Sequence, residues 1–357
     1  MRVRVEAGRN TRSATVLEHH SSFSPLALTY MPQCIFCLEE ADNLTDEHVF
    51  PAALGGVLTV NQSVCVECNN GSSMFEQPLA TEFAPIRLIL QIPDRYGQVP
   101  QVPATVRVEE KVYDAKVKGD GKVQLKRIVT EGKTSGGERE FIHQFLTEKQ
   151  KQKLRQEVRA KGHQFIESGP GNPVQAEVSF GGDLKFIGSP EGLRTASKIA
   201  YVGLAFRAGC ALAKSDSFAE IRAYIRKGAG EPRARLFVHE GFLEACQQGP
   251  HQHSIIMAGR HDKKRVDVIV RLFGGICYFV VLSDHYEGAD FVNTLVYDAY
   301  RGEVNDFLLA HEQAEILQTE EVATSAQTVW DDVAAAGRNF CGFLDRAIRA
   351  RKERSRE

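Results

Sequence analysis

Four cysteines in two short pairs dominate the N-terminal part of the sequence: Cys34-Ile-Phe-Cys37 and Cys65-Val-Glu-Cys68. Each pair can turn two sulfurs toward one ion, and 27 residues between the pairs is a spacing typical of a four-thiolate zinc site. The alternatives are two disulfides or four unrelated thiols. Because no secretory signal precedes the pairs, zinc is favoured. We therefore predict that Cys34, Cys37, Cys65 and Cys68 bind a structural Zn²⁺.

The segment around these cysteines has little material for a hydrophobic core. From Met31 to about Leu90 the apolar residues are scattered and interrupted by Gly55-Gly56 and Asn69-Asn70-Gly71. A segment of this size buries too little apolar surface to be stable alone. A structural zinc ion contributes on the order of 10 kcal/mol, which is comparable to the whole folding free energy of a small domain.

A histidine and a carboxylate stand side by side between the two cysteine pairs, as Glu47-His48, and Pro51 and Gly55-Gly56 follow them. A neutral imidazole can accept a proton from water near neutral pH. Carboxylate and amide oxygens are the ligands that Mg²⁺ and Mn²⁺ prefer, and Asn69 could supply the amide oxygen. This combination suits hydrolysis.

The order C-x-x-C, E-H-V-F-P, L-G-G and V-C-x-x-C-N-N resembles the HNH endonucleases with a ββα-metal motif, and in particular the subgroup whose histidine follows a glutamate. The resemblance covers about Cys34 to Leu79. A looser similarity to the downstream part of proteins with this nuclease module extends from Gly192 to Gly228.

The resemblance implies a metal-dependent endonuclease that cleaves phosphodiester bonds, with double-stranded DNA as the expected partner. It implies that His48 is the general base and that Glu47 and Asn69 hold one catalytic Mg²⁺ or Mn²⁺. Asn70 is the alternative amide ligand.

The family usually has an asparagine about five residues before the third cysteine, which orients the catalytic histidine. Here Val60 has that position and Asn61 follows it. Asn61 is therefore the candidate orienting residue, and a backbone carbonyl is the alternative.

Strand geometry leaves room for another function. Successive residues of a strand point to opposite faces, so Glu47 and His48 can serve one centre only where the strand ends or bends; Pro51 and Gly55-Gly56 make such a break plausible. The competing hypothesis is a non-catalytic zinc module that binds nucleic acid or protein.

Composition places the chain among ordinary globular proteins: 357 residues, 43% hydrophobic and 25% charged, enough for two or three domains. No apolar run reaches the roughly 18 residues that a membrane span needs. No hydrophobic segment follows the basic start, so a cytoplasmic location is expected. Four further cysteines are expected to be buried free thiols: Cys210, Cys246, Cys277 and Cys341.

Charge is unevenly distributed along the chain. Residues 31–104 contain two basic and nine acidic residues, whereas residues 105–163 contain fifteen Lys and Arg and nine Asp and Glu. Lys and Arg dominate non-specific affinity for DNA through counterion release. We expect residues 105–163 to supply much of the phosphate contact; a solvated surface is the alternative.

The predicted fold class is α+β, with a small zinc-stabilised ββα-metal module followed by α+β regions with antiparallel sheet. The predicted segments are a basic, disordered tail at 1–30 (or a start of translation at Met31), the HNH domain at 31–95, a hairpin and charged helix at 96–172, an α+β domain at 173–345 and a basic tail at 346–357.

Periodicity predicts individual elements within these segments. They are a hairpin in 104–130 that turns at Gly119-Asp120-Gly121, helices at 147–161, from Pro190 to about Ala205 and at 218–225, and strands at 254–258, 266–270 and 276–282. His251, His253 and His261 are expected to flank a strand in solvent; a second metal site is the alternative.

Overall fold

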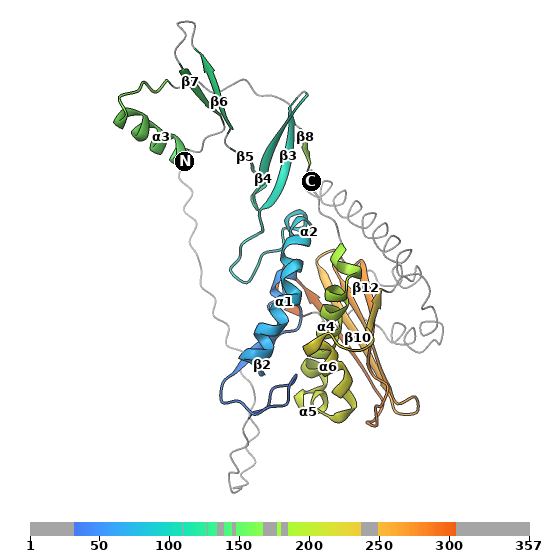
Figure 1. Ribbon diagram of the computed structural model, residues 1–357. Coiled ribbons are helices and arrows are strands. Elements are labelled where there is room, and N and C mark those ends of the chain that lie inside the picture. Colours follow the sequence, from blue (N-terminus) through green and yellow to red (C-terminus); the bar gives the residue numbers. More distant parts are fainter. Residues whose placement is uncertain are drawn as a thin grey trace, which may run out of the picture. The chain divides into compact units, whose positions relative to one another are not determined.

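The computed structural model in Figure 1 describes most of the chain from Pro32 to Val304. The described ranges are 32–108, 110–126, 128–133, 139–144, 148–166, 177–179, 185–236 and 249–304. The predicted tails at 1–30 and 346–357, together with Cys246 and Cys341, lie outside these ranges. Of the other two expected thiols, Cys277 is buried and Cys210 is half-buried.

Two antiparallel strands and a helix make up the N-terminal segment. Strand β1 (Leu44–His48) pairs with β2 (Thr59–Cys65), with Leu44 opposite Cys65 and His48 opposite Thr59. The 3-10 helix η1 (Ala52–Leu54) lies in the connection. Helix α1 (Val66–Glu82) starts directly after β2, and α2 (Ala84–Leu90) follows it. The predicted strand–strand–helix order is confirmed.

The strands of the middle segment form an antiparallel sheet and a separate hairpin. The sheet has the order β5-β4-β3-β8, and β6 pairs with β7. The elements are β3 (Val102–Val108), β4 (Lys111–Val117), β5 (Val123–Leu125), β6 (Ile128–Lys133), β7 (Arg139–Gln144), α3 (Glu148–Ala160) and β8 (Glu177–Ser179).

The hairpin predicted in residues 104–130 left out one strand of this sheet. The chain does turn at Gly119 to Gly121, but the strand before that turn is β4, which pairs with both β3 and β5. Only Ala115 and Val117 of β4 are buried. Because lysines and an aspartate fill most of its other positions, β4 lacks the clear apolar alternation that identifies a strand.

The C-terminal segment packs helices against a six-stranded antiparallel sheet of order β14-β13-β10-β11-β12-β9. The predicted helices and strands are confirmed, and β9, β13 and β14 are additional. The elements are η2 (Lys185–Gly188), α4 (Pro190–Ala208), α5 (Cys210–Ala213), η3 (Asp216–Phe218), α6 (Ala219–Lys227), β9 (Ala234–Leu236), β10 (Gln252–Arg260), β11 (Arg265–Leu272), β12 (Ile276–Ser283), β13 (Phe291–Asp298) and β14 (Glu303–Val304).

Helix α4 is central to this arrangement because it contacts both α1 and the large sheet. Ser189 caps the start of α4 by accepting a hydrogen bond from the Gly192 amide, and Pro190 occupies the first turn, where its missing N–H costs nothing. Helices α1 and α4 lie side by side (Figure 1). None of the described helices combines the length and apolar character needed to span a bilayer.

The N-terminal and C-terminal segments share one hydrophobic core. Phe50 stacks on Tyr297 with ring centroids 5.6 Å apart, and Phe83 stacks on Phe273 at 5.5 Å. The Tyr201 hydroxyl, from α4, donates to the Ile35 carbonyl next to the first cysteine. The apolar surface that residues 31–90 cannot bury alone is therefore buried against α4 and the sheet.

His253 is fully buried, so the expectation that it lies in solvent is wrong. Its ring packs against Phe50 and Phe273. The Phe273 amide donates to Nδ1, so Nε2 carries the proton and donates to the Leu54 carbonyl. A neutral imidazole has both ring nitrogens satisfied here, and it connects β10 to the turn after β1. The apolar rings from distant segments explain the burial, which sequence spacing does not reveal.

Acid should weaken the fold through this histidine. Burial lowers the pKa of His253 to about 4, against about 6.5 in an unfolded chain. The unfolded chain therefore binds the proton more readily, and this contribution to stability is complete above about pH 6.5 and lost as pH falls toward 4. We expect the free energy of unfolding to fall by about 1.4 kcal/mol per pH unit in this window. Urea unfolding measured across the window tests this.

Two variants separate the effect of protonating His253 from the effect of acid on other groups. His253→Gln should remove this part of the pH dependence, although it lowers stability at neutral pH. His163→Gln, at an exposed histidine after α3, should leave the pH dependence unchanged. An equal slope in the wild-type and His253→Gln proteins would contradict the assignment.

Candidate functional site

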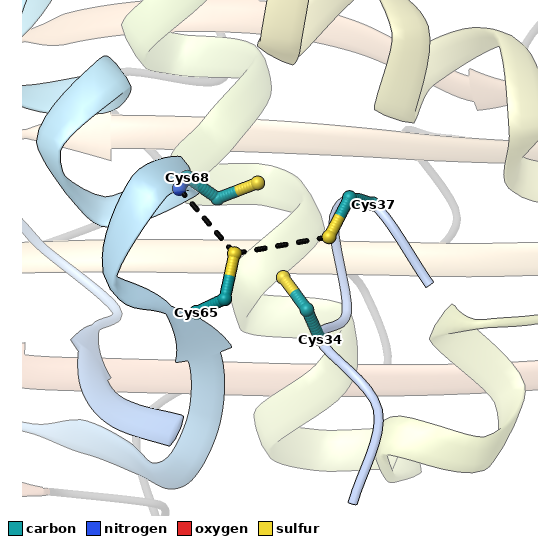
Figure 2. A group of neighbouring side chains, drawn as sticks. All are labelled: Cys34, Cys37, Cys65 and Cys68. Atoms are coloured by element: carbon teal, nitrogen blue, oxygen red, sulfur yellow. Dashed lines mark hydrogen bonds between the residues drawn. The ribbon is translucent and has the colours of Figure 1, made fainter. Parts of the chain in front are cut away.

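The four predicted zinc cysteines come together at one point (Figure 2). Their sulfurs all lie within 4.8 Å of one another, and Cys37 Sγ is 3.8 Å from Cys65 Sγ. A tetrahedral zinc with Zn–S bonds of about 2.3 Å places its sulfurs about 3.8 Å apart, whereas a disulfide needs about 2.05 Å. The geometry thus fits the predicted metal site and not a Cys37–Cys65 disulfide.

Local backbone geometry positions the sulfurs. The Phe36 amide donates to Cys34 Sγ at 3.4 Å, and the Cys68 amide donates to Cys65 Sγ at 3.5 Å, so each short pair folds back on its first cysteine. Cys65 ends β2 and caps α1, which places Cys68 in the first helical turn.

The ionisation of the cluster also favours a bound cation. Burial raises the pKa of Cys37 to about 11 and also raises that of Cys68. Burial opposes ionisation of Cys34 too, but backbone hydrogen bonds outweigh it and lower its pKa. Four thiolates this close together repel one another, and a divalent cation offsets that repulsion. The donor set therefore fits zinc.

Glu47 is buried in β1 and forms an ion pair with a lysine from the C-terminal segment. Glu47 Oε1 lies 2.7 Å from Lys198 Nζ, and both side chains are at most 4% exposed. Lys198 Nζ also lies 2.8 Å from Glu76 Oε1 and donates to Ser72 Oγ at 3.1 Å. The second carboxylate oxygen of Glu47, Oε2, is buried and accepts no hydrogen bond from the described residues.

The ion pairs determine the charge state of this cluster. Burial alone would lower the pKa of Lys198, but the carboxylates of Glu76 and Glu47 outweigh it and raise the pKa. Burial raises the pKa of Glu76, and the Lys198 ammonium opposes that change. Lys198 is therefore a permanent cation at neutral pH.

His48 is the last residue of β1 and is half-buried. A bulge between Thr45 and Glu47 and the end of the strand at His48 disrupt the regular alternation at this point. Nδ1 of His48 is buried and has no partner among the described residues. Burial lowers its pKa, and the positive charges of Lys198 and Arg95 lower it further. The imidazole is therefore neutral near pH 7.

Asn69, in the first turns of α1, faces β1. Its Nδ2 donates to Thr45 Oγ1 at 3.0 Å, and Thr45 Oγ1 donates to the Val64 carbonyl at 2.9 Å. Because the single hydroxyl hydrogen of Thr45 goes to Val64, Thr45 must accept from the amide nitrogen. The amide oxygen Oδ1 then has no donor among the described residues. Asn70 is exposed.

The candidate orienting residue, Asn61, is exposed on β2. Its side chain accepts a hydrogen bond from the Thr59 hydroxyl at 3.2 Å. Within the described ranges no hydrogen bond joins Asn61 to His48. The neighbouring Val60 is buried and lies opposite Glu47 in the β1–β2 pair. A role for Asn61 in orienting His48 stays a prediction.

Four residues of this site were not among the sequence predictions: Thr45, Ser72, Glu76 and Lys198. Thr45 lies two residues before Glu47 on the same strand. Ser72 and Glu76 follow Asn69 by three and seven residues, which places all three on one face of a helix. Lys198 lies within a nearly apolar stretch of α4, and a lysine there needs a buried partner.

Comparison with protein families finds a match in the N-terminal segment. Residues 34–83 match the HNH endonuclease family, and this range starts at the first cysteine and ends one residue after α1. No curated protein and no solved structure matches the chain significantly. Residues 34–83, where two strands and a helix carry the four-cysteine cluster, are therefore similar to the domain of the HNH endonuclease family.

Proposed function

We propose that this protein is a metal-dependent endonuclease that hydrolyses phosphodiester bonds of DNA, with Glu47, His48 and Asn69 as its reactive side chains. The observation that carries the proposal is that each of them retains one polar atom without a protein partner among the described residues. These atoms are Oε2 of Glu47 and Nδ1 of His48, which are both buried, and Oδ1 of the half-buried Asn69. Buried polar atoms are normally paired, so the unpaired atoms of Glu47 and His48 point to an absent ligand.

His48 is the general base in this proposal. Its Nδ1 takes a proton from water, the water oxygen forms a bond to phosphorus, and the bond from phosphorus to the 3′ oxygen breaks. A lowered pKa keeps the imidazole unprotonated at neutral pH, which is the form that can accept the proton.

Glu47 Oε2 and Asn69 Oδ1 would hold one Mg²⁺ or Mn²⁺, since both metals prefer carboxylate and amide oxygens. When bound, the ion supplies positive charge that stabilises the transition state and the departing 3′ oxygen. The Thr45 hydroxyl holds the Asn69 amide so that its oxygen stays available.

The four cysteines are proposed to hold a separate Zn²⁺ that is structural. Four protein sulfurs complete a tetrahedral site and leave no position for water. Such a site agrees with the proposed cytoplasmic location, because thiols stay reduced there.

A plasmid assay tests the proposed function. Supercoiled plasmid is incubated with the zinc-loaded protein in Mg²⁺, in Mn²⁺ or without either ion, and zinc content is measured in parallel. We expect nicked or linear product only where Mg²⁺ or Mn²⁺ is present. Absence of cleavage in every condition, from protein that retains zinc, would contradict the proposal.

Double-stranded DNA is the proposed partner, and α3 is proposed to contact its phosphates. Lys149, Lys153 and Lys161 are exposed on or just after this helix. Changing the three to glutamate should weaken DNA binding at least about tenfold and lower the slope of log affinity against log salt by up to about 3, because fewer counterions are released. Fluorescence anisotropy across salt concentrations measures both.

The control for this prediction is the same charge change at three exposed lysines elsewhere: Lys227, Lys263 and Lys264. Affinity and salt slope that are equal in the two triple variants would show that α3 is an ordinary solvated helix.

A further inference from the structure

Lys198 belongs to the candidate centre although it lies far outside the HNH segment. It is contributed by α4, and its partners Glu47 and Glu76 come from β1 and α1. A lysine this buried is rare unless it is paired, and here it is paired twice.

All three donors of the Lys198 ammonium are in use. They go to Glu47 Oε1, Glu76 Oε1 and Ser72 Oγ at distances between 2.7 and 3.1 Å. Ser72 in turn donates to the Asn69 carbonyl at 2.8 Å. The ammonium therefore has no donor left for a substrate phosphate, and its effect on the reaction must pass through the groups that it holds.

The two oxygens of Glu47 are in different situations. Oε1 is held by Lys198, whereas Oε2 is buried and has no partner among the described residues. We propose that Lys198 is a positioning residue of the nuclease centre, which holds Oε1 of Glu47 and so directs Oε2 toward the divalent cation. This inference rests on the proposed function.

The same ion pair reduces the attraction of the site for a divalent cation. With both carboxylates ionised, as their ion pairs with the ammonium favour, Glu47, Glu76 and Lys198 together carry one net negative charge. Without the ammonium the cluster carries two, and without the Glu76 carboxylate it carries none. The affinity of the centre for Mn²⁺ should follow this charge, because the interaction of charges across a few ångströms of protein is strong.

A mutant cycle with Mn²⁺ alone as the probe tests the inference by calorimetry. Lys198→Met should bind Mn²⁺ at least about tenfold more tightly than the wild type, and Glu76→Gln at least about tenfold more weakly. The double variant, Lys198→Met with Glu76→Gln, has the wild-type net charge and should bind within about threefold of it. If Glu76 were itself a metal ligand, the double variant would stay weak, and that result would overturn the charge account.

Cleavage at saturating Mn²⁺ tests the positioning part. Lys198→Met and the double variant should both cleave at least about tenfold more slowly, although neither binds the ion more than about threefold more weakly than the wild type. Cleavage at the wild-type rate in both would overturn the positioning role. The double variant leaves one unpaired buried carboxylate where Lys198→Met leaves two, so it keeps the test open if Lys198→Met does not fold.

Lys227→Met is the matched control, since this lysine is exposed at the end of α6. It should change neither Mn²⁺ affinity nor cleavage. Failure of the wild type to bind Mn²⁺ or to cleave would count against the proposed function. A wild type that binds and cleaves, combined with Mn²⁺ affinities that are equal across the cycle, would overturn the inference about Lys198 alone.

Discussion

Replacement of His48 by alanine is expected to slow DNA cleavage by about 10²- to 10⁴-fold, the range that a positioned general base contributes. Zinc content and the free energy of unfolding should change little, because His48 is half-buried and its Nδ1 makes no hydrogen bond to the described residues. Single-turnover cleavage of plasmid DNA at saturating Mg²⁺ measures the loss.

The His48 experiment also decides between the two classes of function. A non-catalytic zinc module that binds nucleic acid or protein needs no general base. In that case the wild type would not cleave DNA, and His48→Ala would leave binding unchanged. The control is His163→Ala, which changes an exposed histidine and should cleave at the wild-type rate. Wild-type cleavage by His48→Ala would remove His48 from the mechanism.

Loss of one zinc cysteine is expected to unfold the N-terminal segment. Cys34 is fully buried, and Cys34→Ser replaces a thiolate ligand by a hydroxyl that binds zinc poorly. A structural zinc contributes on the order of 10 kcal/mol, which is as large as the whole stability of a typical domain. Zinc content by mass spectrometry and thermal unfolding by circular dichroism should both show the loss.

Because the two segments share one core, loss of zinc should destabilise the C-terminal segment as well. Phe50 and Phe83 pack on Tyr297 and Phe273 of the C-terminal segment, so unfolding of the zinc segment should also lower the melting temperature of the sheet. Cys210→Ser is the control, since Cys210 is a half-buried cysteine of α5 outside the four-sulfur cluster. Full zinc occupancy in Cys34→Ser would contradict the four-thiolate site.

Sequence spacing alone was enough for the parts of the site that depend on short-range geometry. Two residues between the cysteines of a pair bring both sulfurs to one side of a tight turn, and the four-sulfur cluster follows once β1 pairs with β2. The helices and antiparallel strands of the C-terminal segment likewise follow from local apolar periodicity and turn residues, whereas the strand–strand–helix order was implied by the resemblance to the HNH endonucleases.

Tertiary structure decided what surrounds the reactive side chains. Lys198 pairs with Glu47, which lies 151 residues earlier in the sequence, and His253 is hydrogen-bonded to Leu54, which lies 199 residues earlier. Neither contact has a local signature, since each depends on how α4 and the sheet pack on the zinc segment. A pattern in the sequence predicts the structure of neighbouring residues within one turn or strand. A buried ion pair between distant residues depends on how the whole core packs, so no local pattern predicts it.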